Sequence, residues 1–423
     1  MTGRVRKPFL VILILLFVTV FRLTALPLSF RQLEEPVDDY LQSLPAMQRM
    51  SLLFLVNIDG NGRYRALEYD DEGLPLVPGG CLFFSYNVAS TAAGIISFTD
   101  AIAAYCDRHH VPRPYVAIDQ EGGDVNRLRN LTSSLPSPLQ VSRFLTPHEA
   151  AKLYGLQGAQ MAALGFDLNL APVVESAAPY NGEFLARRVY GSAAEAAAFS
   201  SVAVRAYQSQ GIMCAVKHFP GNSNADPHTG MSVMDIDRMS LAFSLDLPLS
   251  VVFASEPAAV VMSHAVVPAV DPDDPAVLSR KWIMDILRGS FGYTGLVISD
   301  DIFMGALSSF ERPDLAVRAI RAGADVLMIS DKYFKEYARA LVSEAERDLP
   351  FAALVREAQR HVVLFKLRAG LLCLQESADG NLKLVEVPLA GQRGSDEVRL
   401  RTFLDAKEIG TEFYVCHFSG GQP

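Results

Sequence analysis

The sequence predicts an α/β fold, a (β/α)8 barrel of the TIM type that forms a single domain over residues 30–375. Three observations lead to this prediction. Short apolar segments alternate with segments of helical spacing along most of the chain, as in folds built on a parallel sheet. Most of the apolar segments end in a polar residue, where α/β barrels carry their functional groups. The domain is also long enough for a barrel with loop insertions.

The expected strands are short, nearly continuous apolar runs, which are typical of strands buried on both faces. In chain order they cover residues 51–58, 79–85, 115–119, 167–174, 213–216, 258–263, 295–299 and 324–330. A doubly wound open sheet with a second domain is the alternative. It is disfavoured because no GxGxxG turn follows the first strand and no linker divides the chain.

The expected helices show apolar residues three and four positions apart. They cover residues 90–109, 148–164, 193–210, 279–290, 315–323, 332–346 and 354–372. Residues 30–50 are interpreted as a linker and a short helix that lead into the barrel. Residues 376–423 depart from the alternating pattern and contain one strand-like run, 382–387, so they are expected to form a C-terminal appendage of unknown role.

The N-terminus has the pattern of an export segment. Arg4, Arg6 and Lys7 precede an almost unbroken apolar run, Phe9–Phe21. This order of a basic and an apolar region predicts that residues 1–29 are a signal peptide or an uncleaved membrane anchor. We therefore expect an exported protein, either periplasmic or anchored in a membrane and facing away from the cytoplasm.

Composition narrows the class of protein. Half of the residues are apolar and 20% are charged, as expected for a chain with a large core. The formal net charge of -9 disfavours a nucleic-acid-binding protein. The five cysteines are widely spaced and lack a CxxC pair, which argues against a disulfide scaffold or a zinc site. We expect a monomer with no metal and no organic cofactor.

In a barrel, the polar residues at the strand ends converge on one rim. These residues are Asp119, Glu175, Lys217, His218, His264, Asp300 and Asp301. Such a mixture suits a hydroxyl-rich ligand; two carboxylates indicate acetal hydrolysis, whereas carboxylates with several histidines also suit metal-assisted hydrolysis. The adjacent acids Asp300 and Asp301 have a simpler interpretation as a helix N-cap.

A polar loop follows the fifth expected strand and contains Asp226 and His228. A carboxylate beside an imidazole orients the ring and raises its pKa, which favours proton transfer near neutral pH. The same pair is also compatible with an ordinary solvated loop.

Several motifs occur together in a fixed order. They are Asp119-Gln-Glu-Gly-Gly123 with Arg127, Asp167-Leu-Asn-Leu-Ala-Pro172-Val, Lys217-His-Phe-Pro-Gly221, Asp226-Pro-His228 and Ser299-Asp-Asp-x-x-Met304. In this combination the chain closely resembles the β-N-acetylglucosaminidase branch of glycoside hydrolase family 3, over roughly residues 45–372.

The resemblance implies a role for each matching residue. Asp300 would be the nucleophile and Asp301 would cap or orient the following helix. Asp226 and His228 would form the general acid/base pair on a mobile loop. The positions that match the sugar-binding residues of the family are Asp119, Arg127, Arg188, Lys217 and His218. The implied activity is that of a retaining exo-β-N-acetylglucosaminidase acting on oligosaccharides derived from peptidoglycan or chitin, without a cofactor.

Five departures from the family pattern bear on specificity, the first being Asp124, which stands where arginine is frequent after Glu-Gly-Gly. The loop between Gly221 and Asp226 is shorter than usual, and Asn222 replaces a common histidine. Glu175 stands where aspartate is usual, and Phe303 stands where a small residue is common. Three alternatives remain open: another family 3 β-glycosidase such as a β-glucosidase or β-xylosidase, a β-N-acetylglucosaminide phosphorylase, and a non-catalytic envelope protein that binds sugar.

Overall fold

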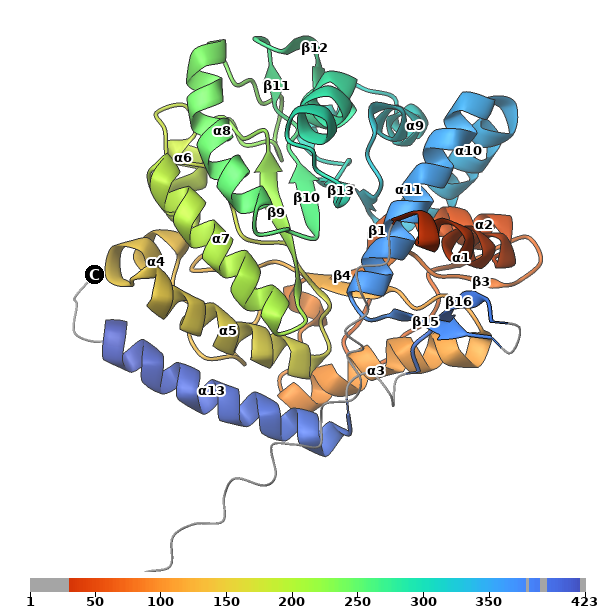
Figure 1. Cartoon of the computed structure of the whole chain (residues 1–423), viewed down its shortest axis with the longest axis horizontal. Helices are drawn as coiled ribbons and strands as arrows, with labels where there is room; N and C mark the ends of the chain where they lie inside the picture. The colour runs from red at the N-terminus through yellow and green to blue at the C-terminus, as the bar shows by residue number, and fades with distance from the viewer. Residues whose placement is uncertain (1–29, 378–379, 389–393, 419–423) are drawn as a thin grey trace, which may run out of the picture.

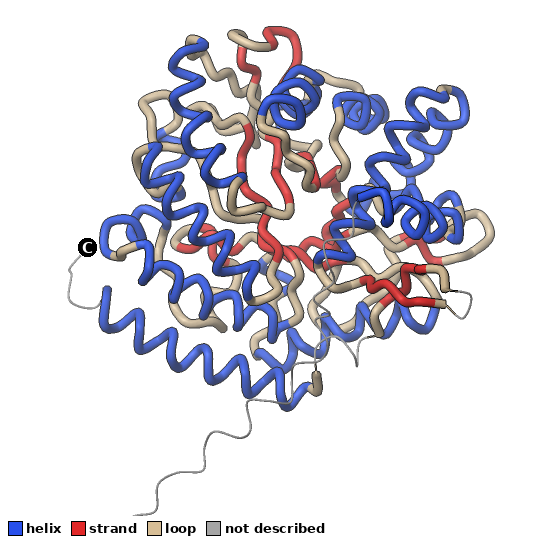
Figure 2. Tube along the Cα trace, viewed as in Figure 1, coloured by secondary structure: helices blue, strands red, loops and turns tan. Residues whose placement is uncertain are grey.

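The computed structural model describes residues 30–377, 380–388 and 394–418. Eight parallel strands form a nearly closed barrel, which confirms the predicted fold (Figure 2). In chain order the strands are β1 (Phe54–Asn57), β4 (Gly80–Phe83), β5 (Tyr115–Ile118), β8 (Leu168–Asn169), β9 (Met213–Phe219), β10 (Ala259–Met262), β13 (Leu296–Ser299) and β14 (Leu327–Ile329). From β1 to β13 each of these strands pairs with the next, and β14 pairs back with β1.

The seam between β13 and β14 closes the barrel with help from a side chain. One parallel bridge, between Ile298 and Val326, joins the two strands. The Asp325 carboxylate accepts a hydrogen bond of 2.7 Å from the Val297 amide, and the Val326 amide donates to the Val297 carbonyl at 3.0 Å. Arg288 pairs with the same carboxylate at 2.6 Å. The side chain of Asp325 therefore supplements the short ladder.

Helices surround the barrel on its outside (Figure 1). Those that match the predicted ones are α3 (Ala92–His109), α5 (Pro147–Leu164), α7 (Ala193–Ser209), η4 (Lys281–Ser290), α9 (Arg312–Ala322), α10 (Phe334–Arg347) and α11 (Leu349–Arg368). Local sequence explains several of their starts. The Ser192 hydroxyl accepts a hydrogen bond from the Glu195 amide, while the Glu195 carboxylate accepts one from the Ser192 amide, a capping box that satisfies two terminal donors.

The structure corrects the sequence prediction in three connections. Helix α8 (Arg238–Phe253), which joins β9 to β10, was not predicted. The connection from β1 to β4, expected to be a loop, contains a small hairpin, β2 (Glu68–Tyr69) with β3 (Pro75–Leu76). The strand expected over residues 167–174 is reduced to the two residues of β8, and it is followed by Pro172, which has no amide hydrogen for a ladder.

Both ends of the described chain pack on the barrel. At the N-terminal end, α1 (Phe30–Ser43) and α2 (Ala46–Ser51) lie where a linker and a short helix were expected. The hairpin of β15 (Leu372–Glu376) and β16 (Leu382–Glu386) begins before the predicted appendage, where the last helix was expected to end, and its second strand covers most of the predicted strand-like run. The C-terminal appendage also contains a long helix that was not predicted, α13 (Asp396–Phe418), which lies along α5 (Figure 1).

The predicted signal peptide or anchor, residues 1–29, lies outside the described residues. Among the described helices, none combines the length and the apolar character that a membrane span requires.

Candidate active site

Asp300 lies at the carboxyl end of β13, on the barrel rim. Its Oδ1 accepts a hydrogen bond of 2.9 Å from the Asp301 amide. Burial acts to raise the pKa of Asp300, but the nearby His264 and His218 and the Asp301 amide outweigh burial, so this pKa lies below the usual value of 3.8. Asp300 is therefore an ionised, partly shielded carboxylate, the form that a nucleophile requires.

Asp301 has a different environment. Its Oδ1 accepts a hydrogen bond of 3.0 Å from the Phe303 amide, and its carbonyl accepts one of 2.9 Å from His264 Nε2. Burial raises the pKa of Asp301 above 3.8, and the neighbouring Asp300 charge adds to that effect. The carboxylate of Asp301 is thus engaged with the following turn, as the predicted capping role requires.

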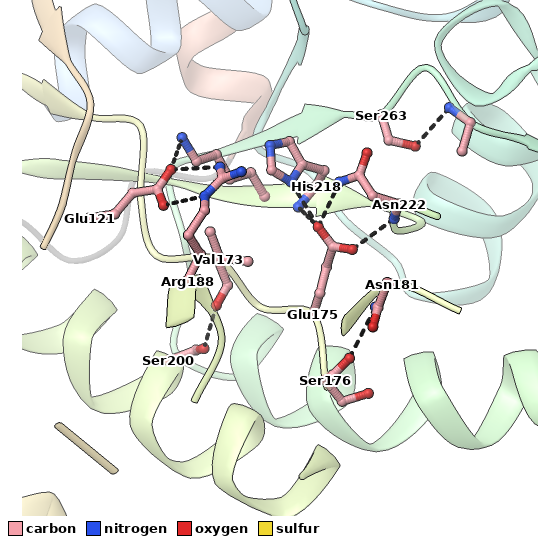
Figure 3. Close-up of polar contacts among 12 residues, drawn as sticks. Glu121, Val173, Glu175, Ser176, Asn181, Arg188, Ser200, His218, Asn222 and Ser263 are labelled. Carbon is pink, nitrogen blue, oxygen red and sulfur yellow. Dashed lines mark hydrogen bonds and ion pairs between the residues drawn. The ribbon is translucent and has the colours of Figure 1, made fainter. Parts of the chain in front are cut away.

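A chain of charged groups lies on the rim over β5, β6 (Gln120–Gly122) and β9. Lys217 Nζ is 2.6 Å from Asp119 Oδ1 and 2.6 Å from Glu121 Oε1. Arg188 forms a bidentate pair with Glu121, with both hydrogen bonds at 2.9 Å (Figure 3). These contacts bring three of the predicted site residues, Asp119, Arg188 and Lys217, into one network.

Glu121 is the member of this network that the sequence analysis missed. Burial acts to raise its pKa, but the charges of Lys217 and Arg188 lower the pKa of Glu121 to about 2. Burial likewise acts to lower the pKa of Lys217, and the charges of Asp119 and Glu121 raise it above 10.5. The available signal was the position of Glu121 inside the Asp119-Gln-Glu-Gly-Gly123 motif.

His218 is held by a buried carboxylate. Its Nδ1 lies 2.8 Å from Glu175 Oε1. The same carboxylate accepts hydrogen bonds from Asn222, at 2.8 Å from Nδ2 and 2.7 Å from the backbone amide (Figure 3). Because Glu175 accepts at both oxygens, the proton between the two side chains is assigned to His218 Nδ1, which leaves Nε2 for a ligand.

Two buried nitrogens on the rim lack a hydrogen-bond partner among the described residues. They are Arg127 Nε and His264 Nδ1. Burial lowers the pKa of His264 below 6.5, although the Asp300 charge opposes this shift. Unpaired polar groups that are buried are costly unless a ligand or water satisfies them, so Arg127 is suited to bind a polar ligand.

Asp226 and His228 form a hydrogen-bonded pair on the loop after β9. The Asp226 Oδ1 atom lies 2.7 Å from His228 Nδ1 and accepts a hydrogen bond of 2.9 Å from the His228 amide. These bonds lower the pKa of Asp226, with the backbone bond as the largest cause. The side chains are 47% and 67% exposed, so the pair is accessible to a large ligand.

The loop with His228 contacts the segment that follows Asp300. The Gly305 amide donates to the His228 carbonyl at 3.1 Å, and the Ala306 amide donates to the Pro227 carbonyl at 2.9 Å. The loop that carries the Asp226–His228 pair is therefore attached to the segment that follows Asp300. Within the described residues, no group of three or more His, Cys, Asp and Glu side chains is placed to hold a metal ion.

A family model described as the glycosyl hydrolase family 3 N terminal domain matches residues 76–364. The β-hexosaminidase of Stenotrophomonas maltophilia strain K279a is 34% identical over 289 residues, which cover 65% of this chain and 82% of that protein. β-Hexosaminidase A of Pseudoalteromonas piscicida is 29% identical over 59% of this chain, which spans only 45% of that longer protein.

Two solved structures also superpose on this chain. A glycoside hydrolase family 3 β-N-acetylglucosaminidase from Paenibacillus sp. str. FPU-7 superposes with a TM-score of 0.69 at 26% identity, covering 86% of this chain and 68% of that chain. The β-N-acetylhexosaminidase of Beutenbergia cavernae superposes with a TM-score of 0.67 at 28% identity, covering 76% of this chain and 98% of that chain.

Proposed function

This chain belongs to glycosyl hydrolase family 3, and we propose that it is a retaining exo-β-N-acetylglucosaminidase that releases terminal N-acetylglucosamine from peptidoglycan- or chitin-derived oligosaccharides. The observation that carries the proposal is the contact between two segments of the rim. Asp300 offers an ionised carboxylate, and the loop with the Asp226–His228 pair is hydrogen-bonded to the segment five residues further along the chain, at Gly305.

In the first step, an Asp300 oxygen attacks the anomeric carbon and the bond from that carbon to the leaving oxygen breaks. His228 Nδ1 faces Asp226 at 2.7 Å, so Nε2 is the atom that gives its proton to the leaving oxygen. Asp226 orients the ring and stabilises its protonated form. A covalent glycosyl ester on Asp300 results, as in other retaining enzymes.

In the second step, water attacks the anomeric carbon of the glycosyl ester and the bond to Asp300 breaks. His228 Nε2 takes the proton of the attacking water, which restores the acid for the next turnover. Two displacements at one carbon retain the β configuration. Exposure of the His228 side chain, at 67%, suits a group that must allow the product to leave.

The sugar is proposed to bind over the charged network and His218. Lys217 and Arg188 are held by buried carboxylates, so their remaining N–H groups are fixed in direction and can donate charged hydrogen bonds to hydroxyl and acetamido oxygens. Arg127 adds a donor that lacks a partner among the described residues. His218 Nε2 and Asp119 complete the proposed set.

The test is turnover of p-nitrophenyl N-acetyl-β-glucosaminide with and without phosphate, followed by trapping with a 5-fluoro N-acetylglucosaminyl fluoride. We expect hydrolysis that does not need phosphate and a mass adduct on the peptide that contains Asp300. Strong phosphate dependence would identify a phosphorylase, and sugar binding without turnover would identify a non-catalytic protein; either result overturns the proposal.

We also propose that the protein is exported and acts as a monomer. The proposal of export rests on the basic residues and the apolar run within residues 1–29. N-terminal sequencing of protein from fractionated cells distinguishes a cleaved signal peptide, an uncleaved anchor and a protein that is not exported. A cleaved, soluble form outside the cytoplasm indicates a signal peptide, a full-length membrane form indicates an anchor, and a full-length cytoplasmic form contradicts export. Sedimentation velocity measures the oligomeric state.

A further inference from the structure

We propose that Asn222, held by Glu175, is a positioning residue for proton transfer: it fixes the root of the loop that carries the Asp226–His228 pair. This inference rests on the proposed function and deepens it. The structure brings Asn222 and Glu175 into direct contact. Their sequence separation of 47 residues conceals this relationship in the sequence.

The contact is buried and uses both ends of the carboxylate. Asn222 Nδ2 donates to Glu175 Oε1 at 2.8 Å, and the Asn222 amide donates to Oε2 at 2.7 Å. Asn222 is 2% exposed and Glu175 is 7% exposed. Two charge-assisted hydrogen bonds in a buried setting are strong and directional, so the backbone at Asn222 has one preferred position.

The neighbouring backbone is shaped to reach this carboxylate. Gly221 has a φ of +144°, and a Cβ atom there would lie 3.4 Å from Glu175 Oε2 and 3.2 Å from Met234 Sδ. An L residue rarely adopts this conformation. The backbone therefore passes close to Glu175 as it leaves β9, and this turn places Asn222 within hydrogen-bonding distance of the carboxylate.

Little of the loop is free between this root and the acid/base pair. The Ser223 hydroxyl contacts the Ser232 hydroxyl at 2.9 Å and accepts a hydrogen bond from the Ala225 amide at 3.1 Å. Asn224 donates to the Pro179 carbonyl at 2.8 Å. The segment from Asn222 to Ala225 is thus a hydrogen-bonded link between the root of the loop and Asp226, and the contact of Asn222 with Glu175 is its first anchor.

Glu175 also connects the loop to the sugar site, because its Oε1 binds both Asn222 and His218. The same carboxylate thus sets the ring of a proposed sugar-binding residue and the start of the proton-donating loop. Removing the Asn222 amide group leaves the contact between Glu175 and His218 in place. Loss of the Asn222 amide group should therefore impair proton donation to the leaving group and leave sugar binding unchanged.

Two substrates distinguish an effect of Asn222→Ala on proton donation from an effect on sugar binding. Di-N-acetylchitobiose has a sugar leaving group that must be protonated, whereas 2,4-dinitrophenyl N-acetyl-β-glucosaminide has a leaving group that departs without a proton. We expect kcat/KM for the disaccharide to fall about 100-fold, the scale of a misplaced catalytic group, with little change for the dinitrophenyl substrate. Asn130→Ala, at an exposed asparagine outside the site, is the matched control.

Equal losses on both substrates, or no loss on either, would overturn the inference. If Asn222→Ala does not fold, as judged by its thermal unfolding midpoint, Asn222→Ser removes the amide group with a smaller loss of polarity and is measured on the same pair of substrates with the same criterion. A wild-type protein that turns over neither substrate would overturn the proposed function itself, which is a distinguishable result.

Discussion

The amide of Gly305 donates a hydrogen bond of 3.1 Å to the carbonyl oxygen of His228. Gly305 follows Asp300 by five residues, so this bond joins the segment of the proposed nucleophile to the loop of the proposed acid/base. The approach is close: a Cβ atom on Gly305 would lie 2.6 Å from the His228 oxygen and 2.7 Å from the Thr229 carbonyl carbon. Glycine is required here by space and not by its backbone angles.

Gly305→Ala should therefore displace the tip of the loop. The new methyl group meets backbone atoms, which cannot rotate away, so His228 must move relative to Asp300. We expect kcat/KM for a disaccharide to fall about 100-fold, as for other misplaced catalytic groups. Gly155→Ala is the control, because a Cβ atom at Gly155 meets nothing within 4 Å and alanine is favoured inside a helix such as α5. Wild-type kinetics in Gly305→Ala would show that this contact does not position the loop.

The two adjacent acids are expected to differ sharply on mutation. Asp300→Asn removes the proposed nucleophile, and we expect activity to fall by about 10⁴-fold or more, as when other nucleophiles are removed. Asp301→Asn keeps an oxygen that can accept the hydrogen bond from the Phe303 amide, so a loss of about tenfold or less is expected, the scale of one perturbed hydrogen bond. Steady-state rates on p-nitrophenyl N-acetyl-β-glucosaminide check both values. The reverse order of effects would move the nucleophile to Asp301.

The barrel was predictable because its strands are short apolar runs buried on both faces, and their polar ends revealed most of the rim. Helix α8 was missed because it contains Pro248 and its apolar residues do not favour one face. Helix α13 gave a similarly weak signal, since Leu404 and Val415 are exposed on it while Arg399 is buried. Contacts between distant residues could not be predicted: Glu121 meets Arg188 across 67 positions, and no local pattern encodes that pairing.

His264 predicts a pH dependence of stability. Burial lowers its folded pKa below the ordinary value of 6.5, outweighing the nearby charge of Asp300. Below pH 6.5 the unfolded chain therefore binds this proton more readily than the folded protein. The contribution to stability is complete above pH 6.5 and declines as the pH falls toward the folded pKa, by at most about 1.4 kcal/mol per pH unit for one proton.

His264→Gln should remove this part of the pH dependence. We expect the difference in unfolding free energy between wild type and variant to narrow from pH 7 to pH 5, as measured by urea denaturation at both values. His148→Gln, at an exposed histidine in the first turn of α5, should keep the wild-type dependence. Parallel curves for wild type and His264→Gln would contradict the assignment of the shift to His264.

The C-terminal helix α13 is expected to stabilise the barrel through one buried cation. Arg399 is 3% exposed; its Nη1 pairs with Asp100 at 2.7 and 2.8 Å, and its Nε donates to the Ala163 carbonyl at 3.1 Å. Arg399→Leu leaves the Asp100 carboxylate without this cation. Breaking a buried ion pair typically costs about 3–5 kcal/mol, and the partial exposure of Asp100 reduces this, so we expect a loss of about 2–3 kcal/mol in unfolding free energy. The exposed Arg401 on the same helix provides the matched variant Arg401→Leu, which should change stability little. Equal losses of stability in the two variants would show that α13 is held by its apolar contacts alone. We expect kcat/KM to be unchanged in Arg399→Leu, because Arg399 has a structural role and takes no part in the proposed chemistry.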